Sequence, residues 1–312
     1  MPKSTLLDIA KRNGSDPAVG LIDETIKPHP ELIYVPARTI KGTSYKTLIR
    51  TSLPTAGFRK ANDGVTASKS TYDNRRIETY ILNPRWECDK AVADRNEDGP
   101  EIFIFDEATG MLEASLQQVC TNFYYGRDDD YGGDVEGHPG LIDSYDATNM
   151  VVDAGGTTGD TGSSVWLIRF GRKHVNWVWG ENGSMEVEDP RIETITGENG
   201  GSLTGYVQEL LAYPGLQVGS LKSVVRIKKL TADSGKGLTD DVIYDALSKF
   251  PAGQEPDLIL CSKRSLKQLR GSRTATNGTG APAPIPESIE GTQGPIPIRP
   301  SEAILDTEAL TL

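Results

Sequence analysis

The chain has 312 residues and a mass of 33.8 kDa, which is enough for one large domain or two medium ones. Its net charge of −11 disfavours a surface that follows nucleic acid, because such surfaces need clustered basic groups to exchange with phosphate counterions. The three widely spaced cysteines indicate neither a disulfide framework nor a zinc site, and no apolar run approaches the roughly 20 residues that span a membrane.

The first 40 residues are expected to form an extended N-terminal arm. Ser4 can cap a short helix that has Leu6, Leu7, Ile9 and Ala10 on one side and that Gly14 ends. The four prolines from Pro17 to Pro36 allow only a short helical piece before the chain must run extended. Apolar side chains lie between these prolines and need a surface to bury against. That surface belongs either to the same subunit or to a neighbouring chain.

Residues 41–85 are predicted to form a long hairpin. Tyr45–Leu53 and Tyr72–Leu82 have the composition of strands, and the connection Pro54–Lys69 exceeds the usual hairpin loop. In a chain that is acidic overall, the charges here are mostly basic: Lys46, Arg50, Arg59, Lys60, Lys69, Arg75 and Arg76. We expect the hairpin to dock onto an acidic surface, the alternative being a solvated ribbon without a partner.

The stretch Phe103–Gly126 predicts a long amphipathic helix. Asp106 can cap this helix and Gly126 can end it. Small or apolar groups recur about every 3.6 residues, at Ala108, Met111, Leu112, Ser115, Leu116, Val119, Cys120 and Phe123. About 20 residues at 1.5 Å each make a rod of roughly 30 Å, long enough to brace a domain. The helix is either an ordinary core helix or a strut for the whole subunit.

Two loops after this helix have compositions that occur in ligand sites, but neither has the required spacing. In the acidic loop Asp128–Glu136, a calcium-binding pattern starting at Asp128 would need oxygen ligands at the positions of Gly132 and Pro139. The segment Gly155–Ser164 lacks the lysine and the glycine spacing of a phosphate-binding loop. We expect both to be loops without a bound metal or nucleotide.

The next part of the chain is rich in short strands. They are expected at residues 165–170, 175–179, 210–213 and 221–230. The alternating tryptophans Trp166, Trp177 and Trp179 are typical of a packed sheet face, and stacking against nucleic-acid bases is the alternative.

From Leu238 the pattern changes to a small α/β unit. The expected elements are a helix over Asp240–Phe250 capped by Thr239, a buried strand over Asp257–Cys261, a helix over Lys263–Arg270, an irregular loop over Thr274–Pro286 and a strand over Pro295–Arg299.

The sequence contains no recognisable catalytic site. His29, His138 and His174 stand outside the known nucleophile and zinc-hydrolase motifs, and no rule marks two of the many carboxylates as an acid and base pair. We therefore expect no catalytic residues, no cofactor and no metal. An enzyme such as a hydrolase and a DNA-binding module are the alternatives, and neither has a recognisable site.

Four passages of the chain carry a family resemblance. They are Gly42–Leu48 with Leu53–Val65, Phe123–Gly126 with Gly140–Ile142, Leu238–Ile243 with Lys263–Leu269, and Pro295–Arg299 with Thr307–Ala309. Together they resemble the major capsid proteins of tailed bacteriophages, and they span most of the chain.

The resemblance implies the α+β HK97-like capsid fold. Its parts would be an N-terminal arm at 1–40, an extended E-loop at 41–85, a peripheral domain at 86–230 with a spine helix at about 103–126, and an axial α/β domain at 231–312. In the common arrangement the axial domain follows the spine helix directly, whereas strand-rich sequence intervenes here. We therefore expect Val165–Leu230 to form a sheet beneath the long helix.

The implied function is structural and not enzymatic. Copies of the chain would close into hexamers and pentamers of an icosahedral phage head around the double-stranded DNA genome, after assembly in the host cytoplasm. The implied partners are the chain itself, portal, scaffold and decoration proteins, and packaged DNA on the inner face without sequence specificity, with no membrane. The candidate assembly contacts are Arg50, Phe58, Arg59, Lys60, Arg75 and Arg76.

Overall fold

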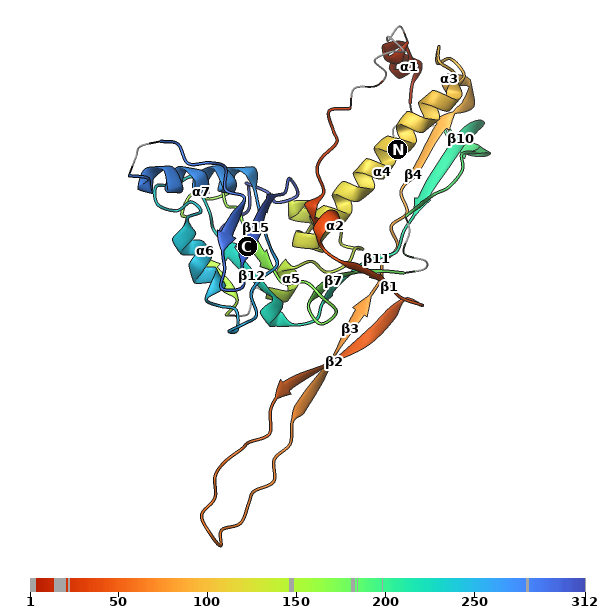
Figure 1. The fold of residues 1–312 in the computed structure, drawn as a ribbon. Coiled ribbons are helices and arrows are strands. Elements are labelled where there is room, and N and C mark those ends of the chain that lie inside the picture. Colours follow the sequence, from red (N-terminus) through yellow and green to blue (C-terminus); the bar gives the residue numbers. More distant parts are fainter. Residues whose placement is uncertain are drawn as a thin grey trace.

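The structure is a computed structural model, and it describes residues 4–13, 21, 23–145, 149–180, 183, 185–197, 199–278 and 281–311. Figure 1 shows an elongated subunit from which a long hairpin points away. The helices are α1 (Leu6–Arg12), α2 (Pro30–Tyr34), α3 (Lys90–Ala93), α4 (Pro100–Tyr125), α5 (Ile142–Tyr145), α6 (Asp240–Leu247) and α7 (Lys263–Thr276), with 3-10 turns η1 (Asp129–Tyr131) and η3 (Leu221–Ser223).

The largest sheet, called the large sheet below, forms the centre of the unit that contains α6 and α7. Its strands follow the order β14 (Ser288–Glu290), β15 (Pro295–Pro300), β13 (Leu258–Cys261), β6 (Val165–Ile168), β12 (Val224–Lys228) and β5 (Val151–Asp153). The central strand β6 runs antiparallel to both neighbours, and Leu167 stands opposite Ile259 on one side and Val225 on the other. Helix α6 packs against β12 and β5, and α7 packs against α6.

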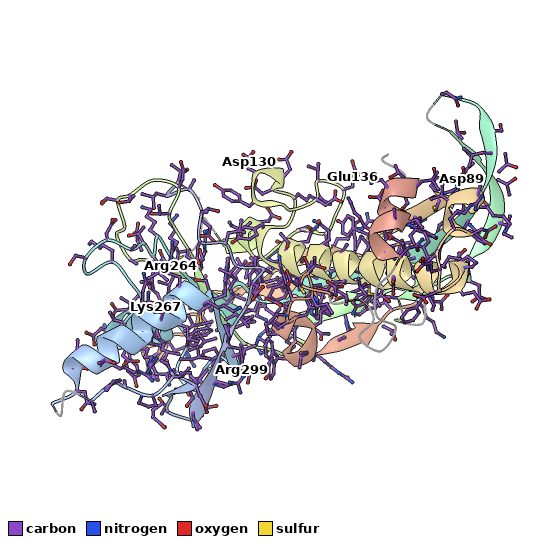
Figure 2. The ribbon with its side chains drawn as sticks, turned by 90° about the horizontal axis from the view of Figure 1, so that it is seen from above. Asp89, Asp130, Glu136, Arg264, Lys267 and Arg299 are labelled. Carbon is purple, nitrogen blue, oxygen red and sulfur yellow. The ribbon has the colours of Figure 1, made fainter. Side chains whose placement is uncertain are left out.

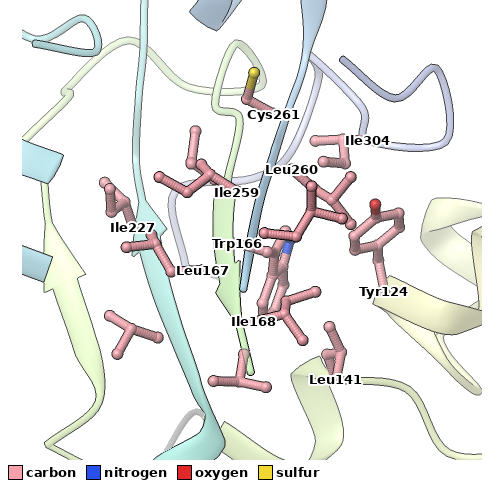
Figure 3. Packing of buried hydrophobic residues seen from close by; sticks show 14 of the residues in the cluster. Tyr124, Leu141, Trp166, Leu167, Ile168, Ile227, Ile259, Leu260, Cys261 and Ile304 are labelled. Atoms are coloured by element: carbon pink, nitrogen blue, oxygen red, sulfur yellow. The ribbon is translucent and has the colours of Figure 1, made fainter. Parts of the chain in front are cut away.

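The main hydrophobic core surrounds this sheet. Every residue of β6 and of β13 is buried, which is the pattern of strands covered on both faces. Figure 3 shows Tyr124, from the end of α4, beside Trp166 of β6, and their ring centroids lie 6.0 Å apart. The large sheet therefore has α6 and α7 on one side and the end of α4 on the other.

Smaller groups of strands link the large sheet to the rest of the subunit. The root sheet consists of β1 (Ala37–Thr39), β7 (Val175–Trp179) and β11 (Pro214–Val218). The outer sheet consists of β4 (Arg85–Asp89), β10 (Ser202–Leu211), β8 (Glu186–Val187) and β9 (Arg191–Thr196). The projecting hairpin consists of β2 (Ser44–Ser52) and β3 (Thr71–Glu78), which confirms the predicted antiparallel pair.

Helix α4 ends where the sequence predicted but begins earlier. Gly126, with φ of 58°, follows the last helical residue and donates its N–H to the Asn122 carbonyl. The expected cap at Asp106 is wrong, because the helix already begins at Pro100, whose fixed φ suits the first turn. Asp106 instead lies on the side of the helix and accepts a hydrogen bond from Arg12 at 3.2 Å.

The two halves of α4 are buried in different cores. Near its end, Val119 and Phe123 lie in the main core, where the Phe123 ring is 5.2 Å from that of Trp177. Near its start, Phe103 lies in a second core with Ile9 and Cys88. Because one rigid rod is anchored in both cores, the strut interpretation of this helix is supported over that of an ordinary core helix.

The expected order of the strands is wrong for part of the chain. Residues 165–230 do not form one sheet beneath α4, because β6 and β12 pair with each other and β6 pairs with β13 in the large sheet. Strand β7 does lie near α4, since Trp177 contacts Phe123. The prediction assumed that elements adjacent in sequence pack together. Strand β6 is instead apolar along its whole length and needs to be covered on both faces, and the α/β unit provides that cover.

The N-terminal arm lies along α4. Helix α1 begins with a capping box of Thr5 and Asp8 instead of the expected Ser4 cap. Further on, the Lys27 N–H donates to Glu113 Oε1 at 3.0 Å, and Gln117 Nε2 donates to the Thr25 carbonyl at 2.8 Å. Several apolar side chains of the arm nevertheless stay exposed, namely Leu6, Leu7, Leu21, Ile26 and Ile33. Residues 1–3, 14–20 and 22 of the expected arm lie outside the described residues.

The α/β unit after Leu238 follows the local sequence signals closely. The Thr239 hydroxyl accepts the Val242 N–H, which confirms the predicted cap of α6. Helix α6 ends at Leu247, three residues before the expected Phe250, and α7 continues to Thr276 instead of Arg270. Trp166 and Trp177 are buried, and Trp179 is partly buried against the same core, which confirms the predicted place of the three tryptophans on packed sheet faces. Within the described residues, no helix is both long and apolar enough to cross a membrane.

Candidate assembly surface

The root of the hairpin is fixed to the body of the subunit. The Tyr45 hydroxyl donates to Gln217 Oε1 at 2.5 Å, and Arg75 donates to the Val218 carbonyl at 2.6 Å, both on β11. The Arg38 guanidinium lies 4.2 Å from the centre of the Tyr45 ring, and Ile77, near the end of β3, is buried. These contacts set the direction in which the hairpin leaves the body.

Beyond the root, β2 and β3 pair with each other along their length. The register runs from Ser44 opposite Glu78 to Ser52 opposite Thr71, with an irregularity after Arg50. Arg50 lies over the Tyr72 ring at 5.5 Å and donates to its hydroxyl at 3.3 Å, so these side chains stiffen the ribbon. Figure 1 shows the ribbon extending away from all other elements, with its loop at the far end.

The loop from Leu53 to Ser70 has no regular secondary structure, and its apolar side chains face solvent. Leu53 is 72% exposed, Val65 is 79% exposed and Phe58 is fully exposed. A few internal bonds shape the loop, including Arg59 to the Asp63 carbonyl at 2.9 Å and Ser68 to the Thr55 carbonyl at 3.2 Å. Exposed apolar groups at the end of a projecting loop are typical of a surface that is covered in an assembly.

The six predicted contact residues do not form one patch. Arg50, Phe58, Arg59 and Lys60 lie on the projecting ribbon and its loop, as expected. Arg75 lies at the root and donates a hydrogen bond to the Val218 carbonyl of its own subunit. Arg76 forms an ion pair with Glu78 at 2.7 Å. Between Ser44 and Glu78 there are seven basic and three acidic side chains, so the ribbon is basic on an acidic subunit.

Some acidic side chains lie beside α4, away from the hairpin. Figure 2 shows Asp130 and Glu136 on a loop beside α4 and Asp89 near the start of that helix, whereas Arg264 and Lys267 lie at the opposite end, on α7. In the acidic loop, Asp128 caps η1 by accepting the Asp130 N–H. Among the described residues, no three His, Cys, Asp or Glu side chains are placed to hold a metal ion.

Sequence reasoning missed a pair of buried carboxylates at the end of α4. The adjacent tyrosines Tyr124 and Tyr125 donate to Glu31 Oε1 at 2.6 Å and to Glu308 Oε1 at 2.7 Å. Ser301 also donates to Glu31, and Arg226 lies 3.4 Å from Glu308 Oε2. These contacts tie both ends of the chain to α4. The passage Phe123–Gly126 marked this part of the chain as a family feature, but it did not indicate that the two tyrosines would bind distant carboxylates.

A histidine and a cysteine also come together against α4. His29 Nε2 lies 3.3 Å from Glu113 Oε2, and His29 Nδ1 lies 3.5 Å from Cys120 Sγ, beside a cavity of about 200 Å³. A cysteine next to a histidine that is itself held by a carboxylate is the arrangement of a catalytic cysteine with its general base. Burial raises the pKa of the Cys120 thiol far above its ordinary value, however, which keeps the sulfur protonated and unreactive.

Known proteins share this architecture. Residues 34–311 match the family described as major capsid protein GP7. In a solved structure of bacteriophage Epsilon15, a chain with 22% identity superimposes with a TM-score of 0.72 over 99% of this chain and 98% of its own length. A chain from Mycobacterium phage Ogopogo has 9% identity and a TM-score of 0.50 over 67% of this chain and 94% of its own. No curated protein matches the sequence significantly.

The family match covers most of the chain, and the likeness to the Epsilon15 structure covers nearly all of it. The mixed α+β architecture is that of the HK97-like capsid fold. The chain therefore belongs to the GP7 family of major capsid proteins, the structural proteins of the tailed-phage head.

Proposed function

We propose that copies of this chain close into hexamers and pentamers of an icosahedral shell around double-stranded DNA. As a major capsid protein the chain is a structural component of the virion and not an enzyme. The observation that carries the finer proposal is the projecting hairpin. Its root is bonded firmly to β11, while Leu53, Phe58 and Val65 at its far end are largely exposed in the isolated subunit. Such a projection suits a contact with another copy.

The parts of the subunit receive their proposed roles from this arrangement. The hairpin is the E-loop, α4 is the spine helix, and the residues before β1 are the N-terminal arm. The outer sheet with the start of α4 forms the peripheral domain. The large sheet with α6 and α7 forms the axial domain at the symmetry axes, so this domain also takes in β5, β6 and β12 from before residue 231.

The remaining partners follow from the same proposal. Portal, scaffold and decoration proteins would bind the assembled shell, which forms in the host cytoplasm. Packaged DNA would meet the inner face without sequence specificity. The contact would be weak overall, because a chain with a net charge of −11 has little general attraction for phosphate.

Deleting Gly57–Ser68 tests the proposal. The deletion removes exposed residues only and leaves the root contacts of Tyr45 and Arg75 in place, so the subunit should stay folded. We expect a monomer with unchanged circular dichroism and unfolding midpoint that forms no shells under electron microscopy. A variant with the same twelve positions replaced by glycine and serine separates loss of side chains from loss of length. Normal shells from the deletion would refute the proposal.

A further inference from the structure

Residues 23–29 run beside α4 as an irregular segment, which we call the strap. Figure 1 shows this part of the chain just before α2. The strap has no regular secondary structure, and residues 24–28 are exposed. Among the described residues, no backbone–backbone hydrogen bond joins residues 23–28 to another part of the chain. The strap is therefore held in place by bonds that involve side chains.

Glu113 on α4 is the centre of these bonds. Its Oε1 accepts the Lys27 N–H at 3.0 Å, and its Oε2 lies 3.3 Å from His29 Nε2. Gln117, one turn further along α4, donates from Nε2 to the Thr25 carbonyl at 2.8 Å and to Glu113 Oε1 at 2.7 Å. One carboxylate thus holds the strap at two points and orients the amide that holds it at a third.

The strap borders a cavity instead of packing closely on the helix. The cavity has a volume of about 200 Å³, and its lining includes Lys27, Pro28 and His29 of the strap and Gln117, Cys120 and Thr121 of α4. Side chains that border empty space lack packing partners on that side, so they gain little from dispersion contacts. Lifting the strap therefore breaks a few hydrogen bonds and uncovers little close-packed apolar surface.

The residues that follow the strap are held much more firmly. Pro30 and Glu31, at the start of α2, are both buried. The Glu31 carboxylate accepts hydrogen bonds from Tyr124 and Ser301, and Trp177 Nε1 donates to the Glu31 carbonyl at 3.0 Å. Segments with few buried apolar contacts open at a lower free energy than the core to which they are attached. The boundary between the two kinds of segment falls between His29 and Pro30.

We propose that the strap opens as a unit while Glu31 stays bound, and that Glu113 is the residue that keeps the strap closed. Opening uncovers Cys120, which is 1% exposed and whose Sγ lies 3.5 Å from His29 Nδ1. The strap is thus a cover that controls access to this face of α4 and to the adjoining cavity. The proposal concerns the isolated subunit and does not depend on the proposed function in assembly.

Thiol labelling of the purified subunit measures the opening. N-ethylmaleimide adds irreversibly to an accessible thiol, and mass spectrometry of the digested protein quantifies the addition at each cysteine. Cys261 lies on β13 in the large sheet and is 0% exposed, so its labelling reports the opening of the core. We expect Cys120 to react at least about tenfold faster than Cys261 in native buffer. Low concentrations of urea should accelerate Cys261 more than Cys120, because opening the strap exposes less surface.

Two substitutions on α4 test the role of Glu113. Glu113→Ala removes the bonds to Lys27 and His29, which exist only when the strap is closed, and should accelerate the labelling of Cys120 about tenfold or more. Glu101→Ala, at an exposed residue in the first turn of the same helix, is the matched control. It should change the labelling rate of Cys120 less than about twofold.

Tyr124→Phe tests where the strap ends. This substitution removes a bond to Glu31 that is present whether the strap is closed or open. It should therefore accelerate the labelling of Cys261 but change that of Cys120 less than about twofold. Equal labelling rates of Cys120 and Cys261 with the same dependence on urea in the unmodified subunit would overturn the inference. So would a Cys120 rate that Glu113→Ala leaves unchanged, or that Tyr124→Phe raises as much as Glu113→Ala does.

Discussion

Val119 shows how strongly one side chain joins α4 to the core. It is 3% exposed and lies among the apolar residues around Phe123. Val119→Asp would bury a charge without a partner, so we expect it to lower the free energy of unfolding of the isolated subunit by roughly 3 to 5 kcal/mol. Urea unfolding measures this value.

Thr109→Asp is the control for this substitution. It adds the same charge to an exposed position of the same helix, and its effect should stay within about 1 kcal/mol. If Val119→Asp were as mild as this control, the packing of α4 on the core would have to be different from the one described.

His138 makes the stability of the subunit depend on pH. Its side chain is 2% exposed, Nδ1 lies 3.1 Å from the Pro139 carbonyl oxygen, and the ring meets the Trp177 ring edge-on. Burial lowers the pKa of His138 from 6.5 to about 4, since the charged ring would lose its water. Above pH 6.5 the ring is neutral in both the folded and the unfolded chain, so it adds no pH dependence there.

As the pH falls from 6.5 to 4, the unfolded chain binds a proton at this site and the folded chain does not. The folded subunit should therefore lose about 3 kcal/mol over this range, and no more from this group below it. His138→Gln should remove that part of the slope in urea titrations across pH, while the carboxylates continue to contribute equally in both proteins. Identical slopes would show that His138 is not buried in its neutral form.

At the scale of elements, the end of the chain holds α4 and the large sheet together. Arg226 on β12 is 1% exposed, Glu308 is 2% exposed, and Arg226 lies 3.4 Å from Glu308 Oε2. Ser164 donates a hydrogen bond to the same oxygen at 2.6 Å. Replacing Arg226 by methionine would leave the Glu308 carboxylate buried without its cation. We expect a loss of roughly 3 to 5 kcal/mol in the free energy of unfolding.

Arg191→Met on β9 is the matched control for this pair. Arg191 also contacts glutamates, Glu188 at 2.6 Å and Glu209 at 3.2 Å, but its side chain is 43% exposed. Water and salt screen such pairs, and the loss should be below about 1 kcal/mol. Similar losses for the two arginines, measured by chemical denaturation, would argue that burial of the Glu308 network contributes little.

At the scale of the whole molecule, assembly should depend on salt. The hairpin is basic, whereas the chain as a whole carries a net charge of −11. Arg59→Glu reverses a charge on the loop and should weaken shell formation more at low than at high ionic strength, because salt screens exposed charges beyond about 10 Å at 0.1 M. Light scattering during assembly at several salt concentrations measures the effect. A defect that does not vary with salt would mean that Arg59 acts through shape and not through charge.

Local sequence determined the elements whose signals lie within a few residues of one another. The hairpin strands, the end of α4 at Gly126, the Thr239 cap and strand β13 were all predictable, because propensity, caps and turn residues act over one or two turns of chain. The resemblance of the four passages to capsid proteins also indicated the family correctly.

Tertiary structure alone decided which elements pair and which charges are buried. Strand β6 pairs with β13, about 90 residues later in the chain, and no local pattern specifies a partner at that distance. No sequence motif marks Glu31 or Glu308, yet both are buried. Glu31 accepts hydrogen bonds from Tyr124 and from the distant Ser301, and Glu308 accepts from Tyr125 and from the distant Ser164. A carboxylate becomes stable in the interior only when the completed fold brings its donors together, so its burial cannot be inferred from its sequence neighbours.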